Sequence, residues 1–152
     1  MPKELVASSG FLLAKLGLAF KTRALARLEQ ADFDPYHYSV LAILGEGASK
    51  TQATIATAAS IDPSRLVALL DSLEERGLVT RKRDPQDRRR HVVTITADGK
   101  GQLLVLRSIA KEVEDEYLAP LDAESRETLH GLLLELASYH DPRCAFALQA
   151  EA

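Results

Sequence analysis

Two helix-start signals stand close together near the middle of the chain, and they constrain the fold more than any other feature. Ser49-Lys-Thr-Gln52 has the form of a capping box, in which serine caps a helix and glutamine follows three residues later. Asp62-Pro63 is a second start, an acidic cap followed by proline at the first helical position. The pattern predicts short helices over about 49–59 and 63–76. Two short helices joined by a tight turn are typical of a helix-turn-helix.

The periodicity of the apolar residues changes after Gly77, which fits the C-cap of the second helix. Segments 78–83 and 91–96 are rich in β-branched side chains that alternate in polarity, as in half-buried strands. The buried face of this pair is expected to consist of Val79, Val93 and Ile95. Segment 84–90 holds turn formers and charge, so we predict a hairpin with a basic tip.

Longer helical patterns flank this region on both sides. They are predicted over 5–30, from Asp34-Pro35 to about Leu44, over about 99–118, and over about 122–140. We therefore predict a mainly α fold with a small β-hairpin wing. The third of these helices repeats its apolar residues at 3-4-3-4 spacing, which suits helix–helix contact; its seam is Leu103, Leu106, Ala110, Val113 and Tyr117. The pattern alone leaves open whether the partner helix belongs to the same chain or to a second copy.

Composition excludes several classes of protein. The 152 residues suit one domain, and no apolar run approaches the roughly 20 residues that span a bilayer. The N-terminus lacks the pattern of a secretory signal, so we expect a cytoplasmic protein. The single cysteine, Cys144, excludes an intramolecular disulfide, and the four scattered histidines give no metal-ligand spacing. No catalytic or phosphate-cradling motif is present, so we predict neither an enzyme nor a bound cofactor.

The charge is unevenly distributed along the chain, although the net charge is only −3. Seven arginine and lysine residues lie within 76–90, whereas acidic residues concentrate within 112–127. Basic residues gathered on a predicted hairpin and helix-turn-helix indicate a partner with phosphate groups, namely double-stranded DNA.

The second helix of a helix-turn-helix enters the major groove with its N-terminal residues at the base edges. We therefore predict base contacts from Ser64 and Arg65, where a bidentate arginine–guanine pair is worth roughly 1–3 kcal/mol of discrimination. Ser49, Thr51 and Gln52, at the start of the preceding helix, are predicted to hold phosphates and fix the register.

The hairpin supplies a second set of predicted DNA contacts, Arg81, Arg88, Arg89 and Arg90. The last three are too close together to be satisfied by the nearby acids alone, and an arginine on a hairpin tip fits a narrow minor groove. Asp87 would repel phosphate itself, so its predicted role is to hold Arg88 or Arg89 extended through a charge-assisted pair.

These residues resemble the core of the MarR family of winged-helix regulators over about 51–101. The match is densest in three runs, Arg65-Leu66-Val67…Leu70…Leu73-Glu-Glu-Arg-Gly-Leu-Val79, Asp84-Pro-Gln-Asp-Arg-Arg89 and Val93-Thr-Ile-Thr96-Ala-Asp-Gly99. The resemblance extends over about 5–140 in the number and length of helices. It implies an obligate triangular dimer in a single-domain chain: a winged helix-turn-helix DNA-binding lobe over 33–98, dimerisation helices over 5–31 and 99–140, and a tail over 141–152. It also places the family's Asp-x-Arg wing motif on Asp87 and Arg89, which makes Arg89 the minor-groove arginine.

The same resemblance implies a site for a small aromatic or amphipathic effector between the dimer base and the winged lobe. The candidate lining residues are Phe11, Phe20, Tyr36, His37 and Tyr38, with Arg23 or His37 as the partner of an anion. Aromatic residues at helical spacing are also common core residues, which is the alternative. Other members sense oxidants through a cysteine near the N-terminus, a position where this chain has none; Cys144 lies in the tail beside Arg143.

The resulting prediction is a dimeric DNA-binding regulator, a repressor of a pseudo-palindromic operator that a small, often aromatic ligand releases. Two recognition helices of such a dimer would lie about one turn of DNA apart, on the order of 34 Å. The alternatives are a winged-helix protein-interaction module, whose basic wing meets an acidic partner, and a redox-responsive regulator acting through Cys144.

Overall fold

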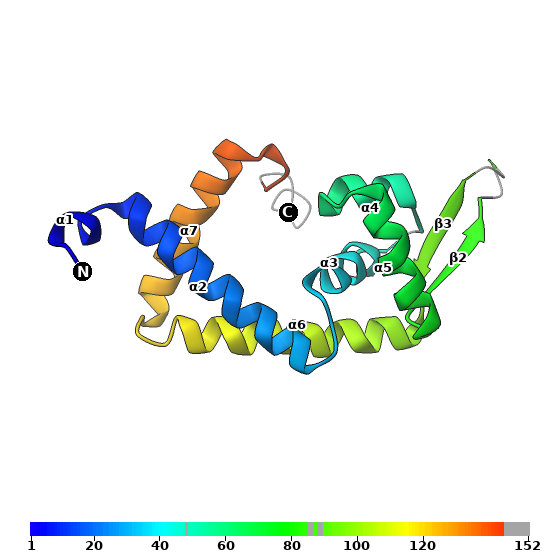
Figure 1. The fold of residues 1–152 in the computed structure, drawn as a ribbon, viewed down its shortest axis with the longest axis horizontal. Coiled ribbons are helices and arrows are strands. Elements are labelled where there is room, and N and C mark those ends of the chain that lie inside the picture. Colours follow the sequence, from blue (N-terminus) through cyan, green and yellow to red (C-terminus); the bar gives the residue numbers. More distant parts are fainter. Residues whose placement is uncertain (48, 85–86, 88–89, 145–152) are drawn as a thin grey trace. The chain divides into compact units, whose positions relative to one another are not determined.

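The computed structural model describes residues 1–47, 49–84, 87 and 90–144, and most of them are helical (Figure 1). The helices are α1 (Lys3–Val6), α2 (Ser9–Gln30), α3 (Pro35–Gly45), α4 (Gln52–Ala59), α5 (Pro63–Glu75), α6 (Ala97–Tyr117) and α7 (Ala123–His140). The strands β1 (Lys50–Thr51), β2 (Val79–Arg83) and β3 (His91–Ile95) form an antiparallel sheet in the order β1-β3-β2. The predicted winged helix-turn-helix is therefore confirmed. The chain divides into two compact units, Met1–Val113 and Glu114–Ala152.

The core of the first unit lies where α3, α4 and α5 pack with the sheet and the start of α6 (Figure 1). Helix α5 contributes the four leucines that its spacing predicted, Leu66, Leu69, Leu70 and Leu73, all buried. The other helices and the sheet contribute Val40, Leu41, Leu44, Ile55, Val79, Val93, Ile95, Leu103 and Leu106. One apolar face per element, turned to a common centre, holds the helix-turn-helix together.

The β2–β3 hairpin has the register that period-two burial requires. Val79 pairs with Ile95 and Arg81 with Val93, and the three predicted inward residues are buried. Gly77 has a φ of +71°, the left-handed conformation that glycine adopts most easily, and it leads the chain from α5 into β2. The strand β3 ends at Ile95. The hydroxyl of the next residue, Thr96, donates to the Gly77 carbonyl at 2.7 Å and accepts from the Gly99 N–H at 2.9 Å.

The single N-terminal helix predicted over 5–30 is two helices, so that prediction was wrong at its start. Ser8 lies in extended backbone between α1 and α2, and its hydroxyl accepts from the Phe11 N–H at 3.2 Å. A serine cap satisfies one of the free N–H groups of a new helix, which favours a break at this position.

The predicted serine cap of α4 was also wrong. Thr51, not Ser49, caps α4, and its hydroxyl accepts from the Thr54 N–H at 3.2 Å. Ser49 instead lies 2.6 Å from the Thr94 hydroxyl of β3, and Lys50 pairs with Val93. Because this short strand keeps the backbone extended through Thr51, the helix begins three residues after Ser49.

The seam of α6 is buried at Leu103 and Leu106, which belong to the core of the first unit, and at Val113. In the second unit, Asp122 caps α7 by accepting from the Ser125 N–H at 2.9 Å. No residue of α7 is buried within the described part of the chain, and three leucines of its predicted stripe are exposed, Leu132, Leu133 and Leu136. Over the described residues, the helices are too short or too polar to cross a membrane.

Candidate nucleic-acid interface

The N-terminus of α5 is fixed by its cap. The Asp62 carboxylate accepts from both the backbone N–H of Ser64, at 2.8 Å, and the Ser64 hydroxyl. The hydrogen bond from the Ser64 side chain, followed by the one from its backbone, lowers the pKa of Asp62. Ser64 is exposed as predicted, but its hydroxyl proton is engaged by the cap, so only its oxygen lone pairs face outward.

Arg65 follows on the exposed side of the same turn, and 52% of its side chain is exposed. Its guanidinium lies over the ring of Tyr36, 4.0 Å from the centroid, and Nη2 is 3.6 Å from Oδ2 of Asp34. Both partners belong to the start of α3. The sequence predicted Arg65 as a base-reading residue and Tyr36 as a ligand-pocket residue, but it gave no sign that the two side chains touch.

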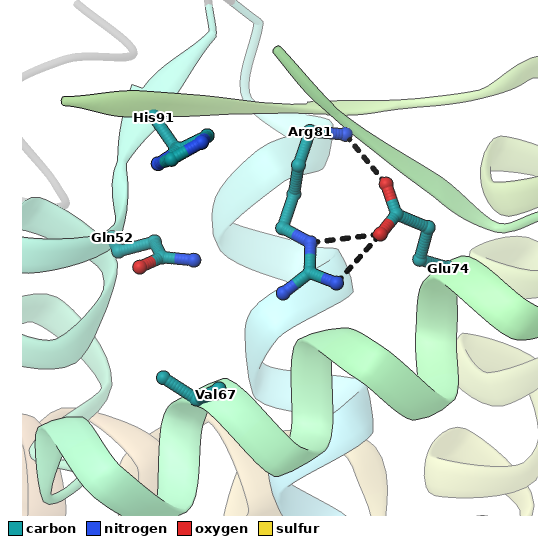
Figure 2. Close-up of a pocket in the computed structure, with 5 residues that line it drawn as sticks. All are labelled: Gln52, Val67, Glu74, Arg81 and His91. Atoms are coloured by element: carbon teal, nitrogen blue, oxygen red, sulfur yellow. Dashed lines mark hydrogen bonds and ion pairs between the residues drawn. The ribbon is translucent and has the colours of Figure 1, made fainter. Parts of the chain in front are cut away.

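Arg81 of β2, one of the predicted DNA contacts, is held by two carboxylates of α5. Nε and Nη2 donate to Oε2 of Glu74 at 2.9 and 2.6 Å, and the Arg81 backbone N–H donates to Oε1 at 2.9 Å. Nη2 also lies 2.6 Å from Oδ1 of Asp71. The hydrogen bond to Glu74 raises the pKa of Arg81 and lowers the pKa of Glu74. Arg81 therefore fastens the hairpin to α5, as Figure 2 shows for the pair with Glu74.

An open depression of about 430 Å³ lies beside this ion pair (Figure 2). It is lined by Gln52, Val67, Glu74, Arg81 and His91. The depression thus joins the first residue of α4, the exposed face of α5 and both strands of the hairpin. Thr51 and Gln52, two of the predicted phosphate contacts, lie at the start of α4, and both are half-buried.

The described part of the wing tip is Asp84, Asp87 and Arg90; Arg88 and Arg89 fall outside the described residues. The Asp84 N–H donates to the Arg90 carbonyl and the Arg90 N–H to the Asp87 carbonyl, both at 2.9 Å. Nε of Arg90 lies 3.4 Å from Oδ2 of Asp87. Asp87 is therefore close to Arg90, whereas its predicted pairing with Arg88 or Arg89 falls outside the described residues.

The six candidate ligand residues fall on two helices and line none of the depression described above. Phe11, Phe20 and Arg23 belong to α2, and Tyr36, His37 and Tyr38 to the start of α3. His37 completes the capping box of α3, since its Nδ1 accepts from the Asp34 N–H at 3.1 Å. Its Nε2 is buried, and none of the described residues forms a hydrogen bond with it; burial lowers the pKa of His37. Tyr36 and Tyr38 pack against the core, the alternative that the sequence left open.

The remaining candidates offer little chemistry. Within the described ranges, no group of three or more His, Cys, Asp or Glu side chains could hold a metal ion. Cys144 is a free, half-buried thiol at the end of the described chain. The adjacent Arg143 guanidinium donates to the Asp141 carboxylate, which lowers the pKa of Asp141 to about 2.

Comparison with known proteins identifies the family. The sequence model of the MarR family matches residues 31–90. The transcriptional regulator HosA of Escherichia coli O111:H- is 31% identical over 108 residues, 71% of this chain and 80% of HosA. A putative regulatory protein for the hcr operon of Thauera aromatica is 31% identical over 102 residues, 67% of this chain, and the chain spans only 61% of that protein's length.

Solved structures agree with this comparison. The transcriptional repressor CouR, bound to a 23-mer DNA duplex, superposes with a TM-score of 0.76 at 32% identity, covering 89% of this chain and 96% of CouR. CouR from Rhodococcus jostii RHA1 bound to p-coumaroyl-CoA superposes with a TM-score of 0.72 at 28% identity, covering 93% and 97%. The relatives are regulators of transcription and not enzymes. The chain therefore belongs to the MarR family of winged helix-turn-helix transcriptional regulators.

Proposed function

We propose that this regulator is a homodimeric repressor, that it binds a pseudo-palindromic operator, and that a small aromatic ligand releases it. The observation that carries the proposal is the exposed Arg65 at the capped start of α5, beside a hairpin fastened to the same helix through Arg81. A helix N-terminus and a basic wing are the two contacts through which a winged helix-turn-helix binds duplex DNA. The DNA complex of CouR supports this reading.

The residues divide between two kinds of DNA contact. Arg65 would read a base edge in the major groove, with Ser64, Thr51 and Gln52 on nearby phosphates and bases. Arg89 would enter the minor groove, with Arg88 and Arg90 beside it and Asp87 holding the tip. Ser49 pairs with Thr94 and Arg81 with Glu74, so neither is carried into this proposal.

The proposed effector is an aromatic acid or its thioester. The complex of CouR with p-coumaroyl-CoA supports this ligand class. Phe11, Phe20 and Arg23 of α2, with Tyr36, His37 and Tyr38 of α3, are the candidate contacts. The buried Nε2 of His37 has no hydrogen-bond partner among the described residues. It suits a ligand oxygen, since a neutral imidazole that accepts at Nδ1 donates at Nε2.

The test is selection of bound fragments from the source genome, followed by affinity measurements across a salt series. Affinity for the selected operator should fall steeply as salt rises. Arg89→Ala should reduce the magnitude of the slope of log affinity against log salt by about 1, the value of one phosphate contact. Arg65→Ala should reduce discrimination between the operator and random DNA while non-specific binding persists. Arg143→Ala is the matched control, because this arginine pairs with Asp141 and belongs to neither α5 nor the hairpin, so its removal should leave the salt slope unchanged.

Two outcomes would contradict the proposal. A purified protein that prefers no genomic fragment over random DNA at physiological salt is not an operator-binding repressor. A salt slope near zero would indicate instead the alternative, a winged helix that docks on protein. Screening aromatic acids and their thioesters for release of the operator then tests the effector separately.

A further inference from the structure

The base-reading arginine of α5 rests on a tyrosine of a different helix. Arg65 and Tyr36 are far apart in the sequence, yet the guanidinium carbon lies 4.0 Å from the ring centroid. Oδ2 of Asp34 lies 3.6 Å from Nη2 of the same guanidinium, beyond ordinary hydrogen-bond distance. One aromatic face and one carboxylate from the start of α3 therefore border the Arg65 side chain.

This support is itself held firmly in place. Oδ1 of Asp34 accepts from the Tyr36 N–H at 2.7 Å, while its other oxygen faces Arg65. Nδ1 of His37 closes the capping box on the Asp34 N–H, and Pro35 fixes the backbone at the first helical position. The Tyr36 ring is half-buried against the core, which restricts its movement away from Arg65.

Stacking on Tyr36 leaves the N–H donors of the Arg65 guanidinium available for a base. An aromatic ring contacts the flat face of the group, whereas the N–H donors that pair with a guanine lie in its plane. An unsupported arginine side chain carries about 2 kcal/mol of rotamer entropy, part of which is lost on binding. A side chain already held over Tyr36 loses less, so its pairing with a base discriminates more strongly.

We propose that Tyr36, assisted by Asp34, is a positioning residue for Arg65. The start of α3 thus contributes to operator specificity without touching DNA. This inference rests on the proposed function, since it assumes that Arg65 reads a base.

The experiment compares Tyr36→Leu with the conservative Tyr36→Phe, which keeps an aromatic face. Arg65→Ala first identifies the base pair at which discrimination is lost. The readout is then the ratio of two affinities, one for the selected operator and one for the same operator with that base pair changed. An exposed cation–π contact of about 0.5–1 kcal/mol corresponds to a roughly 2- to 5-fold fall in this ratio for Tyr36→Leu. Tyr36→Phe should retain the wild-type ratio, and neither variant should alter the salt slope, because no phosphate contact is removed.

The double variant Arg65→Ala/Tyr36→Leu separates positioning from a general loss of structure. If Tyr36 acts only through Arg65, adding Tyr36→Leu to Arg65→Ala leaves the ratio unchanged. The inference would be overturned if Tyr36→Leu lowered the affinity ratio further in the Arg65→Ala background. It would also be overturned if Tyr36→Phe lowered the ratio as much as Tyr36→Leu does. Should Tyr36→Leu fail to fold by circular dichroism, Tyr36→Met, which fills the site with a flexible apolar chain, replaces it in the same cycle.

The outcomes also separate this inference from the proposed function. Wild-type protein without any preferred operator overturns the proposed function. If the wild-type protein prefers an operator but Tyr36→Leu has the same affinity ratio as wild type, the positioning role alone is overturned. If Arg65→Ala loses no discrimination at any base pair, the positioning role also fails, while operator binding stands.

Discussion

Gly99 shows how closely the start of α6 approaches Leu78, the residue before β2. A Cβ at this position would collide with the Leu78 carbonyl oxygen and would lie 2.7 Å from Cγ1 of Ile95. Backbone cannot yield as the end of a flexible side chain can. The glycine therefore permits α6 to lie against β3 and against Leu78, the residue before β2.

Gly99→Ala should destabilise the protein by about 2 kcal/mol or more, because the added methyl group forces α6 away from Leu78. Gly101→Ala is the matched control. Its Cβ would meet nothing within 4 Å, so the substitution should stabilise α6 by roughly 0.5–1 kcal/mol. Urea denaturation of both variants measures the difference. Equal stability of the two would contradict the close approach.

Two arginines with the same predicted partner illustrate what could not be predicted at this scale. Arg65, at a helix start, and Arg81, in the basic segment 76–90, were both assigned to DNA. Arg65 is half-exposed at a helix start, whereas the carboxylates of Asp71 and Glu74 enclose Arg81. The partners of each arginine belong to another element, so only the tertiary fold decides which guanidinium remains available to a ligand.

At the scale of elements, caps decided which boundaries could be predicted. The Asp-Pro starts of α3 and α5 were correct because proline at the first position leaves one choice for the cap. The start of α4 was wrong because Ser49 and Thr51 are both acceptable caps. Pairing of β1 with β3, a contact between distant segments, selects Thr51. The tip residues Arg88 and Arg89 stay predictions.

The capping box of α3 makes stability depend on pH through His37. Burial lowers the pKa of His37; Arg76 lowers it further, while the Asp34 and Asp32 carboxylates act in the opposite direction. The unfolded chain takes up this proton near pH 6.5 and the folded chain only at lower pH, so the unfolded state binds more protons in that window. Stability should therefore fall as the pH falls from about 7 towards 5.5.

His37→Gln should remove this part of the pH dependence. Glutamine at the third helical position can complete a capping box without titrating, so the variant should keep α3 capped. Thermal midpoints between pH 7.5 and 5.5 provide the measurement: wild type should decline more steeply than His37→Gln. Parallel curves would show that His37 does not take up its proton in this window.

At the scale of the whole molecule, the long helices outside the winged lobe carry apolar side chains that the described chain leaves exposed. One face of α2 carries Leu12, Leu13, Leu16 and Phe20, with exposed fractions from 36% to 53%. Leu18 is also exposed, at 69%, and Leu28 is the only buried residue of that helix. A face of this size on an isolated chain favours association. It is consistent with the proposed homodimer, in which segments 5–31 and 99–140 would form the interface.

Leu13→Glu should weaken the dimer at least about 100-fold, because burying an unpaired carboxylate costs several kcal/mol. Sedimentation velocity over a range of concentrations measures the dissociation constant. Val67→Glu is the control, since Val67 is also exposed and apolar, at 44%, but belongs to the recognition helix. If both variants remain dimeric, α2 does not supply the interface.

The pairing of Arg81 with α5 has a consequence for the search along DNA. Arg65 is the only basic residue of α5, and the opposite half of the helix carries Asp71, Glu74 and Glu75. Arg81 and the C-cap residue Arg76 offset two of these three negative charges, so the field of the helix is attractive to phosphate at its first turn and still weakly repulsive near its last. We expect the helix to enter the groove end-on and to be repelled when it approaches flat. A protein built this way should hold random DNA weakly and leave it quickly, so that dwell time is concentrated on sites that Arg65 can read.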